Sequence, residues 1–353
     1  MNNALIAELK TVAAWIDSAI KNSTFPATVK PDFLAQAMRA YPEVGGKRLR
    51  PAIMLWSVAA AGGEVKKAVP AAAALEVFHN WTLVHDDIID DDLVRRNLPT
   101  AHVVLSQAMD LPENRRKKFG CDMAILAGDL MQAWAFDFID QTGCSADVKL
   151  KLARELRDYG YLKLVSGEAV DVAMSYRDAG EVTVEEMFEM QAGKTGALLH
   201  YAARAGWMIG KGYPEAWDEP EAVALGRFGD DLALAFQLRD DYLGVFGKLE
   251  EFGKPIGSDL QEGKATLLLI HALKNLDADG AGKLRKLLYL EKYTASDIEN
   301  ARELFQQAGS VKNMLDAIEK YSAGAVEALK LLPESSGRTL LEELANYLIN
   351  REK

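Results

Sequence analysis

The sequence predicts an all-α protein that forms one large helical domain. Apolar residues recur every three or four positions along most of the chain, and no stretch alternates apolar and polar residues with the Val, Ile and Thr content of a strand. Short Gly- and Pro-containing breakers separate the long runs, without a fixed-period repeat or a low-complexity linker. A chain of 353 residues can bury a large core, so we expect a single domain over residues 1–353 with helices packed around a common centre.

The individual helices follow from the spacing of apolar residues. The first is amphipathic, with apolar side chains stepping by three and four positions at Leu5, Leu9, Val12, Ile16 and Ile20. Ala- and Leu-rich runs predict further helices over residues 52–61, 70–92, 123–139, 148–174, 184–209 and 221–246. The segment Lys194-Thr195-Gly196 interrupts the run 184–209, and the C-terminal part of the chain continues as amphipathic helices with polar joints.

The composition indicates a globular enzyme rather than a nucleic-acid-binding protein. Apolar residues make up 49% of the chain and charged residues 26%, with a net charge of −11 at pH 7. This acidic balance argues against nucleic acid or an anionic membrane face as the main partner. It is compatible with a phosphorylated substrate, because acidic clusters recruit metal ions that in turn hold phosphate.

Cysteine usage and hydropathy predict a cytoplasmic protein without an integral membrane segment. Cys121 and Cys144 form no C-x-x-C pair, and nothing indicates a disulfide framework or a zinc site. The first twenty residues carry charges among their apolar positions, so we expect no signal-peptide core. The longest apolar stretch, residues 123–139, contains Asp129, Gln132 and Asp137, which suits a buried core helix better than a membrane span.

An aspartate cluster ends the apolar run 70–92. Five Asp occupy the seven positions 86–92, and on a helix Asp86 and Asp90 lie about 40° apart in azimuth and about 6 Å apart along the axis. Carboxylates this crowded at the C-terminal side of a helix need compensation, which Mg²⁺ supplies while leaving coordination positions for substrate phosphate. Arg95 and Arg96 follow closely enough to share the anion, and His79 precedes Asp86 on the same face. A solvated acidic helix end, with His79 as an ordinary core histidine, is the alternative interpretation.

A second carboxylate pair, Asp240-Asp241, ends another apolar run far away in the sequence, with Gln237 one turn earlier. Two such helix ends in one domain can face each other across a cavity, and the pair makes the metal interpretation stronger than either cluster alone. The basic residues Lys47, Arg50, Lys194, Lys254 and Lys264 stand near Gly-containing segments. Each alone is typical of a surface cation, whereas together they would supply ligands for two diphosphates.

These segments resemble the trans-isoprenyl diphosphate synthases, or polyprenyl synthetases, of the short-chain type. The resemblance runs from about residue 40 to residue 270 and is carried by the order of its motifs: GGKRLRP (45–51), HDDIIDDDLVRRNLPTAH (85–102), LAGDL (126–130), KTGALL (194–199), FQLRDDYLG (236–244) and GKPIGSDLQEGKATLL (253–268). It implies the isoprenoid synthase fold, a large antiparallel helical bundle around a central cavity, usually as a homodimer.

The resemblance also implies a function. The chain would be a prenyltransferase that condenses an allylic diphosphate with isopentenyl diphosphate to a C15–C20 product such as farnesyl or geranylgeranyl diphosphate. It would use about three Mg²⁺ ions per active site, which assist ionisation of the allylic substrate. A synthase of longer polyprenyl chains is the alternative within the family.

Site residues are carried over position by position. Asp86, Asp90 and Asp240 would bind Mg²⁺, supported by Asp87 and Asp241. The diphosphate of isopentenyl diphosphate would lie among Lys47, Arg50, His79 and Arg96, and the allylic diphosphate among Arg95, Lys194, Thr195, Gln237, Lys254 and Lys264. The catalytic set implied is Asp86, Asp87, Asp90, Arg95, Lys194, Asp240 and Asp241. Trp81, five positions before Asp86, would close the tunnel floor and limit product length; an ordinary core tryptophan is the alternative.

Two positions depart from the family pattern. Gly244 replaces the last Asp of the usual second DDxxD, so metal binding there should rest on Asp240, with Asp241 assisting. Asn97 replaces the usual Gly after the arginine pair, and we expect little effect because Asn tolerates a left-handed backbone.

Three rival functions make different demands on the sequence. A terpene cyclase would need Ser or Thr at position 244 and Glu at position 248, where the chain has Gly244 and Lys248. An HD-type metal phosphohydrolase would use His79 and His85-Asp86, but leaves Asp90, Asp240 and the basic loop without a task. A silent regulatory subunit of a prenyltransferase would be expected to lose aspartates, and both clusters are essentially intact.

Overall fold

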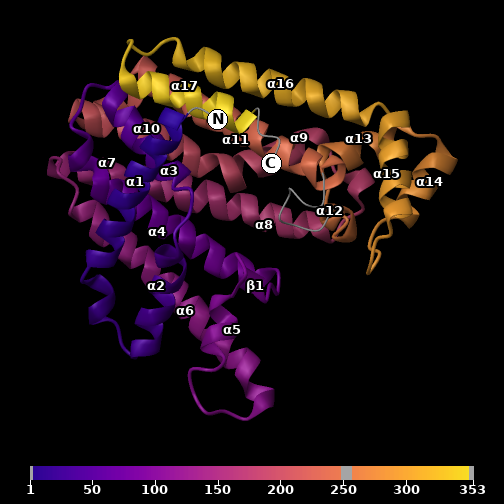
Figure 1. Cartoon of the computed structure of the whole chain (residues 1–353), viewed down its shortest axis with the longest axis horizontal. Helices are drawn as coiled ribbons and strands as arrows, with labels where there is room; N and C mark the ends of the chain where they lie inside the picture. Colours follow the sequence, from indigo (N-terminus) through magenta and orange to yellow (C-terminus); the bar gives the residue numbers. More distant parts are fainter. Residues whose placement is uncertain (1–2, 248–256, 350–353) are drawn as a thin grey trace. The chain divides into compact units, whose positions relative to one another are not determined.

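The chain is almost entirely helical in the computed structural model, which describes residues 3–247 and 257–349 (Figure 1). The α-helices are α1 (Asn3–Asn22), α2 (Asp32–Val44), α3 (Leu49–Ala60), α4 (Val65–Ile89), α5 (Ala101–Leu105), α6 (Glu113–Asp140), α7 (Ala146–Glu155), α8 (Leu164–Ser175), α9 (Val184–Gln191), α10 (Ala197–Lys211), α11 (Pro220–Phe246), α12 (Ser258–Gln261), α13 (Leu267–Asn275), α14 (Ala278–Lys286), α15 (Ala295–Gln307), α16 (Ser310–Leu329) and α17 (Ser336–Ile349). Short 3₁₀ segments are η1 (Phe25–Thr28), η3 (Ala179–Glu181) and η5 (Pro214–Asp218), and π-helical segments are η2 (Leu156–Lys163) and η4 (Ala192–Gly196). The all-α prediction is confirmed, and none of these helices is long and apolar enough to span a membrane.

Two compact units divide the described chain. Unit 1 comprises Met1–Arg154, Arg204–Ala222 and Pro333–Leu340; unit 2 comprises Glu155–Ala203, Val223–Leu332 and Leu341–Lys353. Because both units take segments from distant parts of the sequence, neither corresponds to a simple N- or C-terminal half. A single domain over residues 1–353 stays a prediction.

Helices α4 and α6 form the centre of unit 1. They lie side by side, with α1 and α3 against α4, and α2 and α5 against α6 (Figure 1). Alanines at positions 71–74 of α4, and Ala124 and Ala127 of α6, are almost fully buried. Their small side chains allow close packing along α4, the helix that carries the first aspartate cluster at its end.

Helix α13 is central to unit 2. Its residues Leu267, Leu268, Leu269 and Ile270 are all buried, and a helix that is apolar on every side must be covered on every side. Helices α9, α15 and α16 supply much of this cover. The segments that carry Lys194 and the second aspartate cluster belong to the same unit.

Several helix limits differ from the sequence-based expectation. Helix α4 begins at Val65 rather than at residue 70, and α6 begins at Glu113 rather than at residue 123. The first turns of α6 are rich in Arg and Lys, which are good helix formers but carry no apolar period to reveal them. The predicted run 148–174 consists of α7, η2 and α8 in succession, and η2 in the middle is π-helical.

A short β-ladder between β1 (Val94–Arg95) and β2 (Leu98–Pro99) was not predicted. Two residues per strand are too few for an alternating pattern to show. Arg96 and Asn97 form the connection, both with positive φ (53° and 63°), as a type I′ hairpin turn requires. Asn97 thus has the left-handed backbone that asparagine tolerates, and Arg96 has the same conformation.

Candidate active site

The end of α4 separates the first aspartate cluster into outward and inward carboxylates. Asp86 is half-buried and Asp90 exposed, and the N–H of Asp90 donates to the carbonyl of Asp86 over 2.8 Å, which places them on successive turns. Asp87 is completely buried. Asp86 and Asp90 can therefore be reached by an ion in solvent from successive turns, as can the exposed Asp91 and Asp92 beyond the helix end.

Asp87 is held by two partners inside unit 1. The Tyr41 hydroxyl donates to Asp87 Oδ2, and Arg95 Nε donates to Asp87 Oδ1 over 2.6 Å. Burial and the hydrogen bond to Asp87 raise the pKa of Tyr41, so the hydroxyl keeps its proton. The Ala101 N–H in turn donates to the Tyr41 oxygen over 3.0 Å. Asp87 thus positions Arg95, which fits the supporting role expected for it.

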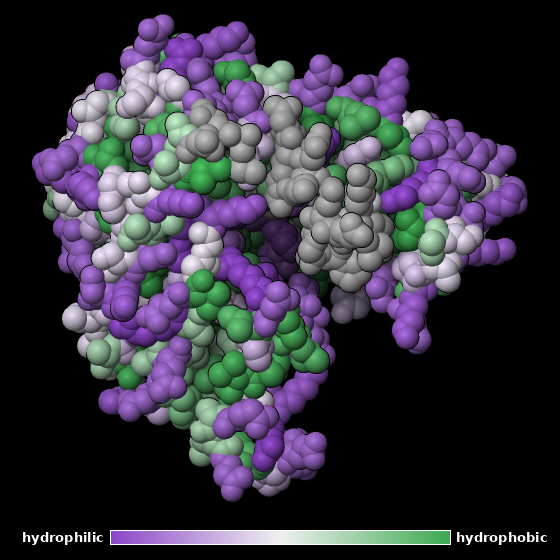
Figure 2. Space-filling model, viewed as in Figure 1, coloured by the Kyte–Doolittle hydropathy of each residue, from purple (hydrophilic) through white to green (hydrophobic). Residues whose placement is uncertain are grey.

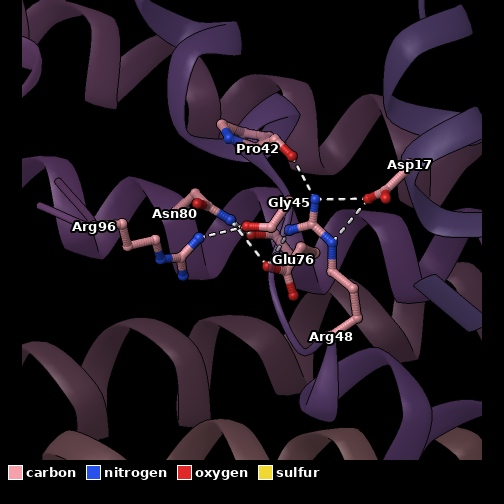
Figure 3. A network of polar contacts seen from close by, with 7 residues as sticks. All are labelled: Asp17, Pro42, Gly45, Arg48, Glu76, Asn80 and Arg96. Carbon is pink, nitrogen blue, oxygen red and sulfur yellow. Dashed lines mark hydrogen bonds and ion pairs between the residues drawn. The ribbon is translucent and has the colours of Figure 1, made fainter. Parts of the chain in front are cut away.

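The β1–β2 hairpin directs its two arginines to different partners. Arg95 pairs with Asp87 beside the aspartate cluster, whereas Arg96 Nη1 donates to the carbonyl of Gly45 in the loop that carries Lys47 (Figure 3). The two arginines thus have different hydrogen-bond partners, although both line the same cavity, and the prediction that they share one anion stays a prediction. The difference in partners matches the resemblance, which assigns Arg95 and Arg96 to different diphosphates.

A cationic neighbourhood surrounds His79 on α4. Burial lowers the pKa of His79 well below its ordinary value, and Arg50, Arg96, Arg95 and Arg48 lower it further. The imidazole is therefore neutral and retains one N–H to donate. Arg50 Nε is buried without a hydrogen-bond partner among the described residues, and burial lowers the pKa of Arg50 while Glu76 opposes that effect. A buried guanidinium N–H beside a neutral histidine suits the binding of an anion.

A cavity of about 210 Å³ lies within unit 1 beside these arginines. Helices α2, α4 and α5 and the hairpin line it with mostly apolar side chains, among them Leu83 and Leu98, and with Arg95 and Arg96. Figure 2 shows apolar side chains gathered over the β1–β2 hairpin and α5, where Leu98 of β2 and Val104 of α5 are about half exposed. An apolar space with cations in its wall suits a ligand with an apolar chain and an anionic head.

The second aspartate pair lies near the end of α11, in unit 2. Asp240 is half-buried, whereas Asp241 is 2% exposed and accepts hydrogen bonds from Gln237 Nε2 (2.9 Å) and Gln191 Nε2 (3.3 Å). Burial raises the pKa of Asp241 to about 7, a shift that Lys264 opposes. Asp240 is thus the reachable member of the pair, as expected. Gln237 Nε2 donates to its neighbour Asp241, and the role of Gln237 as a ligand of the allylic diphosphate stays a prediction.

The absent fifth carboxylate of the second motif has a structural counterpart in Asp259. A Cβ at Gly244 would lie 3.2 Å from Asp259 Oδ2, so a side chain at 244 would press on that carboxylate. Asp259 also acts on Asp241, raising its pKa, and the pKa of Lys264 is raised by both aspartates although burial alone lowers it. The departure at position 244 therefore leaves space for a carboxylate contributed from α12.

Lys194 occupies a π-helical turn in unit 2. The predicted interruption of the helical run is confirmed as η4. A Cβ at Gly167 of α8 would lie only 2.3 Å from the backbone nitrogen of Lys194, so the backbones of α8 and η4 pass close to each other. Lys194 Nζ lies 2.6 Å from Asp171 Oδ2 and 2.8 Å from Glu168 Oε2. These carboxylates raise the pKa of Lys194 against the effect of burial, and the side chain stays charged. π-Turns of this kind are frequent at functional sites.

Trp81 is packed between α4 and α6. It is 5% exposed, and its ring centroid lies 4.8 Å from that of Phe78 and 5.6 Å from that of His85. A Cβ at Gly128 of α6 would lie 3.1 Å from Trp81 Cδ1. The packing is compatible both with a tunnel floor and with a core position, so the chain-length role stays a prediction.

The remaining predicted residues and the unpredicted ones complete the site. Lys47 lies exposed in the 45–48 loop, Thr195 is half-buried in η4, and Lys254 lies outside the described residues. Six residues near these side chains were not predicted from the sequence: Tyr41, Arg48, Glu76, Glu168, Asp171 and Asp259. Arg48 and Asp259 lie within the motifs 45–51 and 253–268, whereas nothing local marks the other four among ordinary helix residues.

The donor set fits Mg²⁺. The accessible carboxylates of Asp86, Asp90 and Asp240 are hard oxygen ligands, and among the described residues no three acidic, His or Cys side chains converge into an all-protein metal site. Mg²⁺ is commonly held by one or two carboxylates together with substrate phosphates and water. Because the clusters belong to different units, the expectation that they face each other stays a prediction.

The phosphohydrolase alternative finds no support in these contacts. His85 Nε2 lies 3.2 Å from the Ile125 carbonyl, and its ring lies against Trp81. His79 is neutral because burial and several nearby arginines disfavour its charged form, and the same arginines would repel a metal cation. A metal held jointly by His79, His85 and Asp86 has no counterpart in the described part of the chain.

Comparison with known proteins agrees with this site. The polyprenyl synthetase family model matches residues 31–305. A short chain isoprenyl diphosphate synthase of Methanothermobacter thermautotrophicus is 35% identical over 346 residues, covering 98% of both chains. The crystal structure of geranylgeranyl pyrophosphate synthetase from Pyrococcus horikoshii Ot3 superposes with a TM-score of 0.86 at 34% identity, over 99% of this chain and 98% of that one.

A further solved structure, geranylgeranyl pyrophosphate synthase from Corynebacterium glutamicum complexed with isoprenyl diphosphate and magnesium, has a TM-score of 0.82 and 28% identity over 98% of both chains. The family model thus covers most of the chain, and relatives above 30% identity cover nearly all of it. The chain therefore belongs to the polyprenyl synthetase family and is a prenyltransferase of the short-chain type.

Proposed function

We propose that this prenyltransferase condenses an allylic diphosphate with isopentenyl diphosphate in the presence of Mg²⁺ and releases a C15–C20 prenyl diphosphate. The observation that supports the proposal is that the charged residues at the end of α4 and in the hairpin differ in exposure and in partners. Asp86 and Asp90 remain accessible, while buried Asp87 aligns Arg95, and Arg96 turns to the basic loop. Different partners for Arg95 and Arg96 suit the binding of two diphosphates, one of which leaves while the other is retained.

The metal ions would be held by Asp86 and Asp90 at one cluster and by Asp240 at the other, in a number the family pattern puts at about three. When bound, they would neutralise charge that develops on the departing diphosphate. Arg95 and Lys194, both fixed by carboxylate partners, add further positive charge without having to reorganise.

The chain's residues bind and orient isopentenyl diphosphate through Lys47, Arg50, His79 and Arg96. His79 donates one N–H as a neutral imidazole. The allylic carbon–oxygen bond breaks and its electron pair leaves with the diphosphate, after which the isopentenyl double bond forms the new carbon–carbon bond. The proton then lost passes to the departed diphosphate. Apolar walls exclude water that would otherwise quench the allylic cation.

The test is a product assay on the full chain. The protein is incubated with Mg²⁺, isopentenyl diphosphate and an allylic diphosphate of five, ten or fifteen carbons, and product lengths are measured. Accumulation of C15 or C20 diphosphate agrees with the proposal. Release of inorganic phosphate without condensation, or a main product well beyond C20, contradicts it.

Replacing Trp81 with alanine is expected to lengthen the products, because the change opens space between α4 and α6. Trp134 of α6 provides a matched control, since it is also fully buried in unit 1, with its Nε1 donating to Ser23 over 2.8 Å. Both changes should lower the free energy of unfolding by about 3–5 kcal/mol. Only Trp81→Ala should shift the chromatographic product profile; an unchanged profile removes Trp81 from the tunnel floor.

We also propose that the chain acts as a cytoplasmic homodimer, as the family pattern implies. Helix α6 supports this, because Ile125, Leu126 and Phe136 are each more than a third exposed on it. Burial of such side chains against a second copy removes apolar surface from water. Sedimentation of a monomer at micromolar concentration would contradict the proposal.

A further inference from the structure

The loop between α2 and α3 has an unusual backbone at Arg48. Helix α2 ends at Val44 and α3 begins at Leu49, so residues 45–48 make the whole connection. Arg48 has φ 49° and ψ 38°, a left-handed conformation that costs an L-residue about 1–2 kcal/mol. A residue without special tolerance for this region keeps it only when its surroundings impose it.

Those surroundings are the contacts of the Arg48 side chain, which is completely buried (Figure 3). Its Nε and Nη2 donate to Asp17 Oδ1 of α1 over 3.0 and 2.7 Å, and its Nη1 donates to Glu76 Oε1 of α4 over 2.6 Å. Nη2 also donates to the Pro42 carbonyl of α2. One guanidinium therefore fixes the loop to three helices, because its Nε, Nη1 and Nη2 all donate to acceptors of the protein.

Glu76 connects this anchor to Arg50. The carboxylate is 6% exposed, accepts from Arg48 and from Asn80 Nδ2 (3.2 Å), and acts electrostatically on Arg50. Arg48 thus compensates a buried carboxylate that would otherwise compete with a diphosphate for Arg50. The Arg50 Nε, buried without a partner among the described residues, remains available for the ligand.

The other end of the loop is held from the hairpin. Arg96 donates to the Gly45 carbonyl, and a Cβ at Gly46 would lie 3.4 Å from Arg96 Nη1, so the guanidinium rests directly on the loop backbone. Arg48 and Arg96 hold the loop at its two ends, with Lys47 between them. The path of the loop is therefore set by contacts other than those of Lys47 and Arg50.

We propose that Arg48, with Glu76, is a positioning residue for isopentenyl diphosphate: it fixes the left-handed loop that presents Lys47 and Arg50, without contacting the substrate. The proposal rests on the assignment of those two cations to the isopentenyl diphosphate site. The three neighbouring basic residues therefore have different roles. Lys47 and Arg50 bind the diphosphate, whereas Arg48 determines where they stand.

The test compares Arg48→Met with Arg39→Met in steady-state kinetics with both substrates. Arg39 is a matched control, because it also joins α2 to the α1 end through Ser23 (2.9 Å) and contacts Glu43, but does not touch the 45–48 loop. Arg48→Met should raise the KM for isopentenyl diphosphate about tenfold or more, with kcat and the allylic KM changed less than about threefold. Arg39→Met should leave all three near the wild-type values.

Two further variants keep the test decisive. Glu76→Gln retains an acceptor for Arg48 but removes the charge, so it should alter isopentenyl diphosphate binding less than Arg48→Met does. Arg48→Lys keeps the charge but cannot span three helices, and should resemble Arg48→Met. If Arg48→Met does not fold, Arg48→Lys and Glu76→Gln test the positioning role instead. The quantity compared is then the rise in the KM for isopentenyl diphosphate relative to the rise in the allylic KM.

Equal rises in both KM values, or a fall in kcat alone, would overturn the proposal and leave Arg48 a stability residue. Titration calorimetry of isopentenyl diphosphate, without allylic substrate, provides a second readout. Wild-type binding that Arg48→Met weakens about tenfold supports the positioning role even if no condensation occurs. Absence of condensation by the wild type would instead contradict the proposed function, so the two failures are distinguishable.

Discussion

Replacing Asp86 with asparagine is expected to lower kcat by about 10²–10³-fold, because it removes one charge from the accessible pair that would hold Mg²⁺. The fold should be retained, since Asp86 is half-buried at the end of α4 and asparagine keeps its volume. Initial rates over a range of Mg²⁺ concentrations measure the effect. The apparent requirement for Mg²⁺ should rise together with the loss of turnover.

Asp91→Asn is the matched control for this change. Asp91 belongs to the same acidic run, but its carboxylate is 60% exposed and pairs with Lys117 over 2.8 Å. Its backbone is left-handed (φ 53°), a conformation that asparagine tolerates as well as aspartate. Asp91→Asn should keep kcat within about threefold of the wild type. Equal losses in both variants would mean that the general negative field, rather than a metal site at Asp86, supports catalysis.

Replacing Lys194 with methionine is expected to lower kcat/KM for the allylic diphosphate by about 10²-fold or more. Methionine keeps the length of the side chain but removes the charge that η4 presents. It also leaves Glu168 and Asp171, both less than a quarter exposed, without their shared cation. The variant should therefore unfold at a lower temperature, and adding Glu168→Gln should recover stability without recovering activity.

Lys163→Met is the control for Lys194→Met. Lys163 lies in the other π-helical segment of unit 2, with its Nζ 4.3 Å from the centroid of the Tyr159 ring. Lys163→Met removes a lysine from a π-helical segment, as Lys194→Met does, but leaves the ion pairs of Glu168 and Asp171 in place. Its kinetics should stay close to those of the wild type. Similar losses of kcat/KM in the two variants would assign the effect to disturbed packing of the π-turns.

Features that depend on a helical period repeated over many residues could be predicted from the sequence. The apolar spacing of α1 predicts one face of Leu5, Leu9, Val12, Ile16 and Ile20; Leu9 is only partly buried, whereas the other four are at most 2% exposed. The first aspartate cluster lies at the end of α4, as expected, whereas α11 continues to Phe246, five residues beyond Asp241. These features succeed because a helical period repeats many times and each repeat reports the same buried face.

Tertiary partners could not be predicted in the same way. Asp86 and Asp87 are chemically identical neighbours, and only the contacts of Asp87 with Tyr41 and Arg95 distinguish the buried carboxylate from the accessible one. Arg48 likewise stands in a motif with two other cations, and its inward direction depends on Glu76, which is far along the chain. Sequence spacing records faces of a helix, but not which distant side chain completes a hydrogen bond.

The β-hairpin shows a second limit. Its strands have two residues each, so the pattern that would reveal it is shorter than any period. Yet the positive φ of Arg96 and Asn97 separates the directions of Arg95 and Arg96. The turn residue Asn97 is the one local signal that could have indicated the hairpin, because asparagine is favoured in such turns.

We propose that Asp86, Asp90 and Asp240 act through Mg²⁺ on one and the same allylic diphosphate. A crystal structure of the full chain with Mg²⁺ and an unreactive allylic diphosphate analogue would test this proposal. We expect metal ions that link that single diphosphate to carboxylates of both clusters, with Arg95 and Lys194 beside it. A diphosphate bound at one cluster alone, with the other cluster directed to bulk solvent, would contradict it.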